Sequence, residues 1–262
     1  MKKAFTLAEV LITLVIIGVV AALTLPTLMT KYQQHVFENQ FKKSLYTISQ
    51  IVAQARTNLG VSRLGAYCTE YTKEKGYYNS NECVTEINEY IKKVKKQQFG
   101  ATTFYTINRN NKPLKTYNNN DTVFTNGTTA AFSLVHTNLL ADGSFLSFKI
   151  SNAVLYFGID LNGDKKPNRW GYDVFVFSLN NKNDAISGFL NSTPTNVSDN
   201  DAKNYADTYY KDSPYRDNYE QLYGTPCNLY STRESNGIGC AYYALRNKCP
   251  YDDTKTYWEC LK

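Results

Sequence analysis

The chain has 262 residues, enough for a domain with a sizeable hydrophobic core. Its net charge of +6 is dispersed over 29 basic and 23 acidic residues, which argues against nucleic-acid binding as the main activity. The sequence has two histidines and contains no P-loop, no G-x-G-x-x-G between a strand and a helix, and no H-E-x-x-H motif. It therefore does not indicate an enzyme.

The N-terminal segment is the most apolar part of the chain. Residues 5–29 contain one ionisable side chain, Glu9, and follow the pair Lys2 and Lys3. A helix needs roughly 20 apolar residues to cross a bilayer, so this segment can span one. A secretory signal peptide has a shorter apolar core and a small-residue cleavage site, and the segment fits neither feature. A simple signal anchor, with Lys2 and Lys3 held in the cytoplasm, is one alternative.

A second interpretation accounts for more of the residues. The string KKAFTLAEVLITLVIIGVVAAL, residues 2–23, resembles the amino-terminal signature of type IV prepilins and type II secretion pseudopilins. The resemblance implies that a prepilin peptidase cuts between Ala4 and Phe5, and that Phe5 is then N-methylated. It also implies that Glu9 is the fifth mature residue and that Pro26 is the family's helix-kinking proline. The family usually has Gly before the cut, where this chain has Ala4.

Glu9 is the unusual residue of this segment. A charge at membrane depth is costly unless it is paired, and by default it marks a functional site. We expect Glu9 of one subunit to pair with the Phe5 amine of a neighbour, which would neutralise both charges and set the register between helices. The alternative is that Glu9 only reaches the cytoplasmic face of the membrane near Lys3.

The helix is predicted to continue well beyond the apolar segment. Pro26 removes one backbone hydrogen bond and is expected to kink the helix, with Thr24 and Thr27 available to satisfy the freed carbonyl. Residues 31–58 are predicted to form an amphipathic helix, and Gly60 is a suitable left-handed cap. The apolar residues recur at spacings of three and four: Phe37, Phe41, Leu45, Ile48, Val52 and Ala55. From Phe5 to about Leu59, one bent helix would be roughly 80 Å long.

The middle of the chain predicts an antiparallel β-meander. Asp142-Gly143 is a strong hairpin signal between residues 130–140 and 144–150. Residues 153–159 and 172–179 are expected to form the next and last strands, and residues 180–201 a long polar loop. We expect the apolar face of this meander to pack on the amphipathic half of the long helix.

Six cysteines on the outer side of a membrane anchor indicate disulfides in an oxidising compartment. Two of them come early and four come late in the chain. This separation favours disulfides between cysteines that follow one another in the sequence, and the last two would staple the C-terminal region. A zinc site is the alternative, but it is disfavoured because no C-x2-C pair is present. Six cysteines allow 15 pairings, and the favoured pairs are Cys68–Cys83, Cys227–Cys240 and Cys249–Cys260.

One loop is a candidate metal site. Asp160, Asn162 and Asp164 alternate as the first oxygen ligands of a calcium loop do, and Asp173 can contribute a further carboxylate. The rest of the calcium-loop pattern is absent, and the alternative is that these side chains cap their own turn. Calcium is the only cofactor considered.

We therefore expect an α+β, pilin-like fold: a long bent N-terminal helix packed on an antiparallel β-meander, with a disulfide-stapled C-terminal region. The expected divisions are a leader (1–4), a transmembrane and assembly helix (5–29), its amphipathic continuation (30–59), a head with the meander (60–179), and a polar, Tyr- and Cys-rich C-terminal region (180–262).

The expected function is that of a structural subunit of a type IV pilus or a type II secretion-like pseudopilus, with no enzymatic activity. The resemblance implies other pilin-like subunits, a prepilin peptidase, an inner-membrane assembly platform and membrane lipid as partners. The N-terminus would be cytoplasmic and the head extracytoplasmic, and the mature chain would lie in a filament. The alternative is a monomeric, membrane-tethered binding or adhesion protein that uses the Tyr-rich residues 205–223. DNA contact through the basic run 92–96 also stays open, because some members of the family serve DNA uptake.

Overall fold

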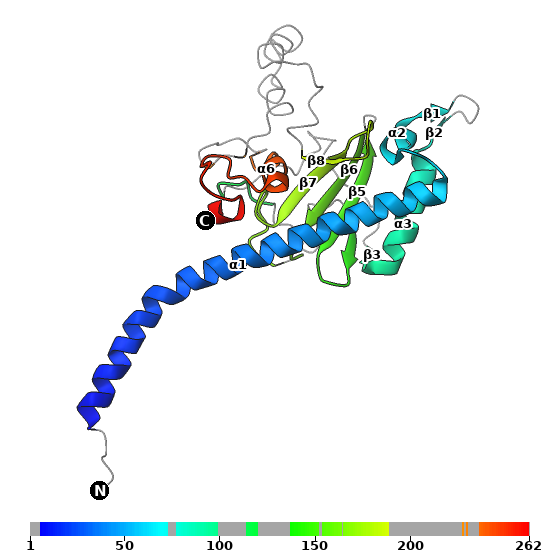
Figure 1. Ribbon diagram of the computed structural model, residues 1–262. Helices are drawn as coiled ribbons and strands as arrows, with labels where there is room; N and C mark the ends of the chain where they lie inside the picture. Colours follow the sequence, from blue (N-terminus) through cyan, green and yellow to red (C-terminus); the bar gives the residue numbers. More distant parts are fainter. Residues whose placement is uncertain are drawn as a thin grey trace.

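A long helix that projects from a compact head dominates the structure (Figure 1). This computed structural model describes residues 6–72, 77–98, 114–119, 137–151, 154–163, 165–188, 227, 229 and 236–261. The head contains one large antiparallel sheet, and helix α1 crosses one face of it (Figure 1). The N-terminal end of α1 lies far from the head (Figure 1). The C-terminus of the chain lies in the head, beside α1.

Helix α1 spans Leu7–Leu59, 53 residues, which corresponds to about 80 Å. Its end is fixed by Gly60, which adopts the left-handed conformation at φ 65° and donates its backbone N–H to the carbonyls near the helix terminus. The predicted amphipathic stripe is the face that packs on the head, and Ile51 joins it. The predicted length, stripe and stop of the helix are therefore confirmed.

Pro26 lies within α1 and does not end it. The helix curves along its first half (Figure 1), as expected where a proline removes a backbone donor. Pro26 has no N–H to donate to the carbonyl of Ala22. Neither Thr24 nor Thr27 donates its hydroxyl to that carbonyl instead. Thr24 donates its hydroxyl to Val20 O at 2.9 Å and Thr27 donates to Thr24 O at 2.8 Å. The predicted role of these two side chains is therefore wrong, because each reaches back to a carbonyl on its own side of the helix.

The large sheet is an antiparallel meander of six strands in sequence order. Its strands are β3 (Lys95–Gln98), β4 (Asn138–Leu140), β5 (Phe145–Ser151), β6 (Val154–Asp160), β7 (Val174–Leu179) and β8 (Ile186–Gly188). The central strands are in register, with Phe148 opposite Phe157 and Phe157 opposite Phe177. The predicted meander is confirmed.

The turn between β4 and β5 follows the predicted hairpin signal. Gly143 has φ 87°, a conformation that favours glycine, and its N–H donates to Leu140 O. Leu140 in turn donates its N–H to Ser144 O at 2.9 Å. Of the strand predicted before this turn, residues 130–136, including His136, lie outside the described residues.

Two strands differ from the predictions. Residues 172–179 were expected to contain the last strand, but β8 follows within the stretch expected to be a polar loop. β8 is short and has little apolar periodicity, so it forms only because β7 offers an edge to pair with. The basic run 92–96 spans two elements: Lys92 and Lys93 lie in the last turn of α3 (Ser80–Val94), and Lys95 and Lys96 begin β3. Residues 189–226, with the Tyr-rich segment, lie outside the described part of the chain.

Both faces of the sheet are covered. Along β7, Phe175, Phe177 and Leu179 point to the face that α1 covers, while Val174 and Val176 point to the other. The second face is closed by a smaller cluster that includes Trp170, which is fully buried. Phe41 of α1 anchors the first face, with its ring centroid 4.9 Å from that of Phe175.

Three short helices and three disulfides complete the head. The helices are α2 (Leu64–Thr69), α6 (Cys240–Arg246) and the 3-10 turn η2 (Trp258–Cys260); a small hairpin, β1 (Tyr71–Thr72) with β2 (Tyr77–Tyr78), follows α2. The disulfides are Cys68–Cys83, Cys227–Cys240 and Cys249–Cys260, the pairs that the cysteine spacing favours. The last disulfide closes a loop that brings Trp258 onto α1, with its ring centroid 5.2 Å from that of Phe41.

A single ion pair links α1 to the β4–β5 turn, and we expect it to make stability depend on pH. Lys43 Nζ lies 2.8 Å from Asp142 Oδ2. Partial burial raises the pKa of Asp142, but hydrogen bonds from Lys43 and Ser144 outweigh it, so the pKa falls below its ordinary value of 3.8. A carboxyl with a lowered folded-state pKa adds stability above its unfolded-state pKa and loses that contribution as pH falls through the folded-state value.

The Asp142→Asn variant is therefore expected to be less stable than the wild type at pH 7. The difference should shrink as the pH falls from about 3.8 through the lower folded-state pKa, because protonation then removes the same charge from the wild type. Urea unfolding at pH 7, 5 and 3 measures this. The exposed Asp253→Asn is the matched control, and an Asp142→Asn deficit that persists unchanged at pH 3 would contradict the prediction.

Candidate functional site

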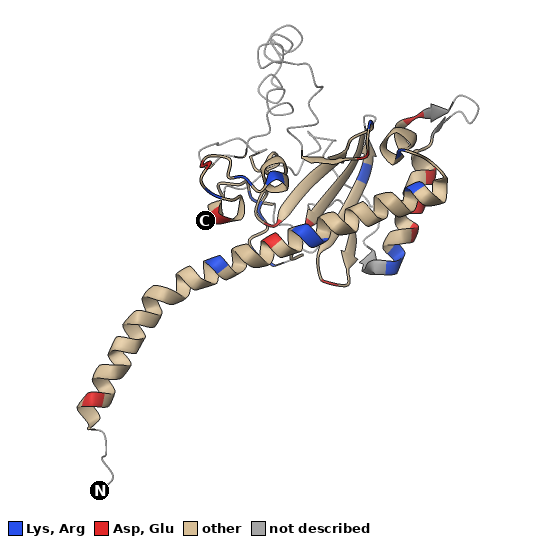
Figure 2. Ribbon diagram, in the orientation of Figure 1, with Lys and Arg blue, Asp and Glu red and all other residues tan. Residues whose placement is uncertain are grey.

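The exposed N-terminal half of α1 is the candidate site. Every residue from Thr6 to Met29 is exposed except Ala21, although most of them are apolar. Within the described residues, α1 is the single helix that is long and apolar enough to cross a membrane. Figure 2 shows the charge pattern: Glu9 lies alone near the start of α1, and the next charge along the helix is Lys31.

Thr6 and Glu9 form a reciprocal capping box at the start of α1. The Glu9 carboxylate accepts from the backbone N–H of Thr6 and from the Thr6 hydroxyl, both at 2.8 Å. In return, the Glu9 backbone N–H donates to Thr6 Oγ1 at 3.3 Å. Two backbone donors that would otherwise have no helical partner are satisfied in this way.

The capping box gives Glu9 a partner within its own chain. Its carboxylate accepts hydrogen bonds from Thr6, which lowers the cost of placing that charge in apolar surroundings. The two partners predicted for Glu9 were a neighbour's Phe5 amine and the membrane surface. The T-x-x-E spacing of residues 6–9 was the signal that could have revealed this contact.

The structure does not gather the predicted site residues in one place. Ala4 and Phe5, the predicted cleavage site, lie outside the described residues. Glu9 and Pro26 lie on the exposed half of α1, whereas the six cysteines lie in the head. The predicted roles of Glu9 and Phe5 in assembly therefore stay predictions.

The loop between β6 and β7 holds the calcium candidates. Asp160 is buried, and its Oδ1 accepts the backbone N–H of Gly163 at 3.0 Å. Asp173 is also buried, and its two carboxylate oxygens accept the N–H groups of Asn168 and Arg169 at 2.8 and 2.7 Å. These contacts are those expected of side chains that cap their own turns.

The other two calcium candidates, Asn162 and Asp164, add no group of metal ligands among the described residues. Asn162 donates its side-chain amide to Lys166 O at 3.0 Å, and Asp164 lies outside the described residues. In the described ranges, no three His, Cys, Asp or Glu side chains cluster in a way that could hold a metal ion. Calcium binding stays a prediction, and the geometry favours the turn-capping role.

The architecture is pilin-like: a long helix with an apolar, exposed first half, an antiparallel sheet on its second half, and disulfides in the C-terminal region. The comparison with protein families agrees. Residues 1–25 match the prokaryotic N-terminal methylation motif, the signature of type IV pilins and pseudopilins. No curated protein and no solved structure matches the chain. The signature implies processing by a prepilin peptidase and assembly into pilin polymers.

Proposed function

We propose that this protein is a structural subunit of a type IV pilus or of a type II secretion-like pseudopilus. It is made as a membrane-anchored prepilin, cleaved before Phe5, N-methylated there and polymerised through α1. The single observation that carries the proposal is the first half of α1, which bears the methylation motif and is exposed from Thr6 to Met29 except at Ala21. In water such a surface would associate, so it needs a bilayer or the same surface of other subunits around it.

The topology follows from charge and disulfides. Lys2 and Lys3 hold the N-terminus in the cytoplasm, and the head is extracytoplasmic, where three disulfides are stable. After cleavage, α1 leaves the bilayer for the core of a filament. An inner-membrane assembly platform and other pilin-like subunits are the partners of this step, and no catalytic role is assigned to the head.

The mass of the mature N-terminus tests the proposal. When the chain is expressed with a prepilin peptidase and purified from membranes, N-terminal peptide mass spectrometry is expected to find a chain that begins with methylated Phe5. Without the peptidase, the chain should keep Met1 or Lys2. A chain that keeps its leader in both cases would instead favour the monomeric, membrane-tethered binding protein.

A further inference from the structure

A groove lies at the neck, where α1 leaves the head. It has a volume of about 620 Å³ and is formed by one face of α1 and by the loop between β6 and β7. Its apolar wall contains Leu28, Met29, Tyr32 and Val36, and its rim contains Lys165 and Lys166. We call it the neck groove.

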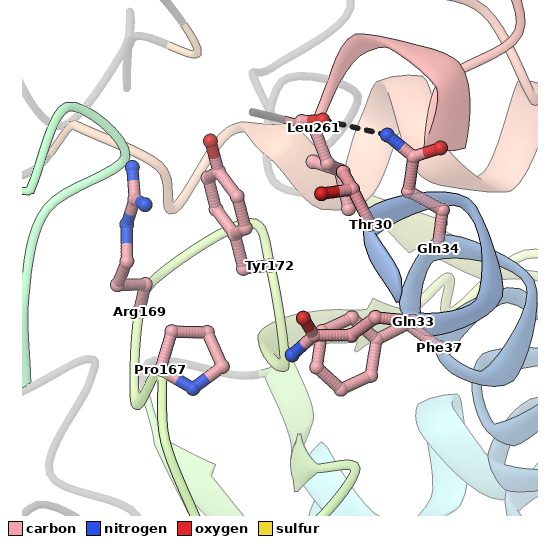
Figure 3. A pocket seen from close by; sticks show the side chains of 8 residues that line it. All are labelled: Thr30, Gln33, Gln34, Phe37, Pro167, Arg169, Tyr172 and Leu261. Carbon is pink, nitrogen blue, oxygen red and sulfur yellow. Dashed lines mark hydrogen bonds between the residues drawn. The ribbon is translucent and has the colours of Figure 1, made fainter. Parts of the chain in front are cut away.

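A smaller pocket of about 110 Å³ adjoins the neck groove and shares Gln33 and Phe37 with it. In Figure 3, Pro167 and Arg169 of the loop face these two side chains across the pocket. The Arg169 guanidinium lies over the Tyr172 ring, 3.7 Å from its centroid. This contact joins two residues of the loop itself, and the loop and α1 line both cavities together.

The neck groove begins where a bilayer would end. From Thr6 to Leu28, α1 rises about 33 Å, and the hydrocarbon core of a bilayer is about 30 Å thick. With Thr6 at the cytoplasmic boundary, Leu28 and Met29 therefore lie at the opposite boundary and Tyr32 lies among the headgroups, where tyrosine is enriched in membrane proteins.

The rim of the neck groove carries two lysines that are unpaired among the described residues. Lys165 and Lys166 are exposed, and neither makes an ion pair with any residue that the structure describes. No described residue that lines the groove is acidic. The nearby carboxylates of Asp160 and Asp173 are buried and occupied by backbone amides. Asp164, the remaining acid of the loop, lies outside the described residues.

We propose that the neck groove binds an anionic phospholipid of the extracytoplasmic leaflet, with the phosphate at Lys165 and Lys166 and an acyl chain along Leu28 and Met29. This inference rests on the membrane anchoring in the proposed function. Two observations favour lipid over a second copy of the chain. The groove continues the exposed apolar surface that faces the bilayer, so lipid already surrounds it. The two lysines at its rim make no ion pair with any described acidic side chain.

Lipid selectivity of the full chain in vesicles tests the proposal. The chain is reconstituted in phosphatidylcholine vesicles that contain a minor fraction of phosphatidylglycerol. Electron paramagnetic resonance of trace spin-labelled phosphatidylglycerol or phosphatidylcholine then gives the relative affinity of the two lipids. The wild type is expected to prefer phosphatidylglycerol, and Lys165→Gln and Lys166→Gln should each lower this preference by about fivefold.

The matched control is the double variant Lys92→Gln/Lys93→Gln. These exposed lysines lie on α3, which contacts the distal end of α1 through the Asn58–Glu86 hydrogen bond. The control loses two positive charges far from the neck, one more than each single variant, and should keep the wild-type preference. A similar loss in the control would overturn the proposal, because the selectivity would then reflect net charge alone.

Three further results would also overturn it. If the wild type shows no preference while it resists alkaline extraction, the groove proposal fails and the anchoring stands. If alkaline carbonate extracts the chain, the anchoring itself fails and the groove proposal fails with it. If Lys165 cross-links to a second copy and the lipid preference is absent, the occupant is another subunit.

Discussion

Replacing Glu9 by glutamine is expected to prevent filament assembly while leaving the start of α1 capped. Glutamine can take the position of glutamate in a capping box, so its side-chain oxygen can still accept from the Thr6 N–H. What it cannot supply is a negative charge for the amine of a neighbouring Phe5. An unpaired buried ammonium costs about 3–5 kcal/mol, which corresponds to a loss of more than about 100-fold in association at each interface.

The test compares three variants. For a pilus, the amount of subunit in filaments sheared from the cell surface is measured; for a pseudopilus, the amount of secreted protein is measured. The amount of mature subunit in the membrane is measured in both cases. Glu9→Gln and Glu9→Ala should both leave subunits in the membrane and few in filaments. Glu38→Gln is the matched control, because Glu38 pairs with Lys42 at 2.6 Å on the same helix, beyond the apolar segment. It should assemble normally, since an exposed pair of this kind contributes about 0.5 kcal/mol or less.

The capping box makes the glutamine variant informative. If Glu9 served only to cap α1, Glu9→Gln would assemble almost as well as the wild type and Glu9→Ala alone would be impaired. That result would remove the intersubunit charge pair from the proposed function. The two variants therefore separate a helix-capping role from a charge-pairing role, although both roles use the same carboxylate.

The parts of this fold that could be predicted have local causes. The length of α1 follows from a sustained apolar pattern that ends at Gly60, and the β4–β5 turn follows from Asp142-Gly143. The disulfides join cysteines that are neighbours in sequence, with separations of 15, 13 and 11 residues. In each case the residues that determine the feature lie close together in the chain.

The features that were missed depend on distant contacts. β8 has only three residues and needs the edge of β7 to form. Asp184, in the turn before β8, accepts the N–H groups of Leu64 and Gly65 at the start of α2, at 2.8 and 2.9 Å. Nothing in the local sequence indicates that these two segments meet. The capping box at Thr6 differs from them, because its signal is local and was overlooked.

The second large effect is expected from Phe41→Ala. Phe41 is almost fully buried, at 2% exposed, and its ring lies 5.7 Å from Phe177 and 5.2 Å from Trp258, measured between centroids. Removing a buried phenylalanine leaves a cavity and typically lowers the free energy of unfolding by about 3–5 kcal/mol. Tyr46→Ala on the same helix is the control. Its side chain is 66% exposed, so the change should be about 0.5 kcal/mol or less.

Urea unfolding of the full chain in detergent, followed by tryptophan fluorescence, measures both variants. Trp170 and Trp258 are the only tryptophans, and Trp258 contacts Phe41 directly. A Phe41→Ala midpoint equal to that of Tyr46→Ala would show that α1 does not depend on this contact. The Cys249–Cys260 disulfide lies in the C-terminal segment and does not join it to α1. A second contact between α1 and that segment is the hydrogen bond that Gln34 donates to Leu261 O at 2.7 Å.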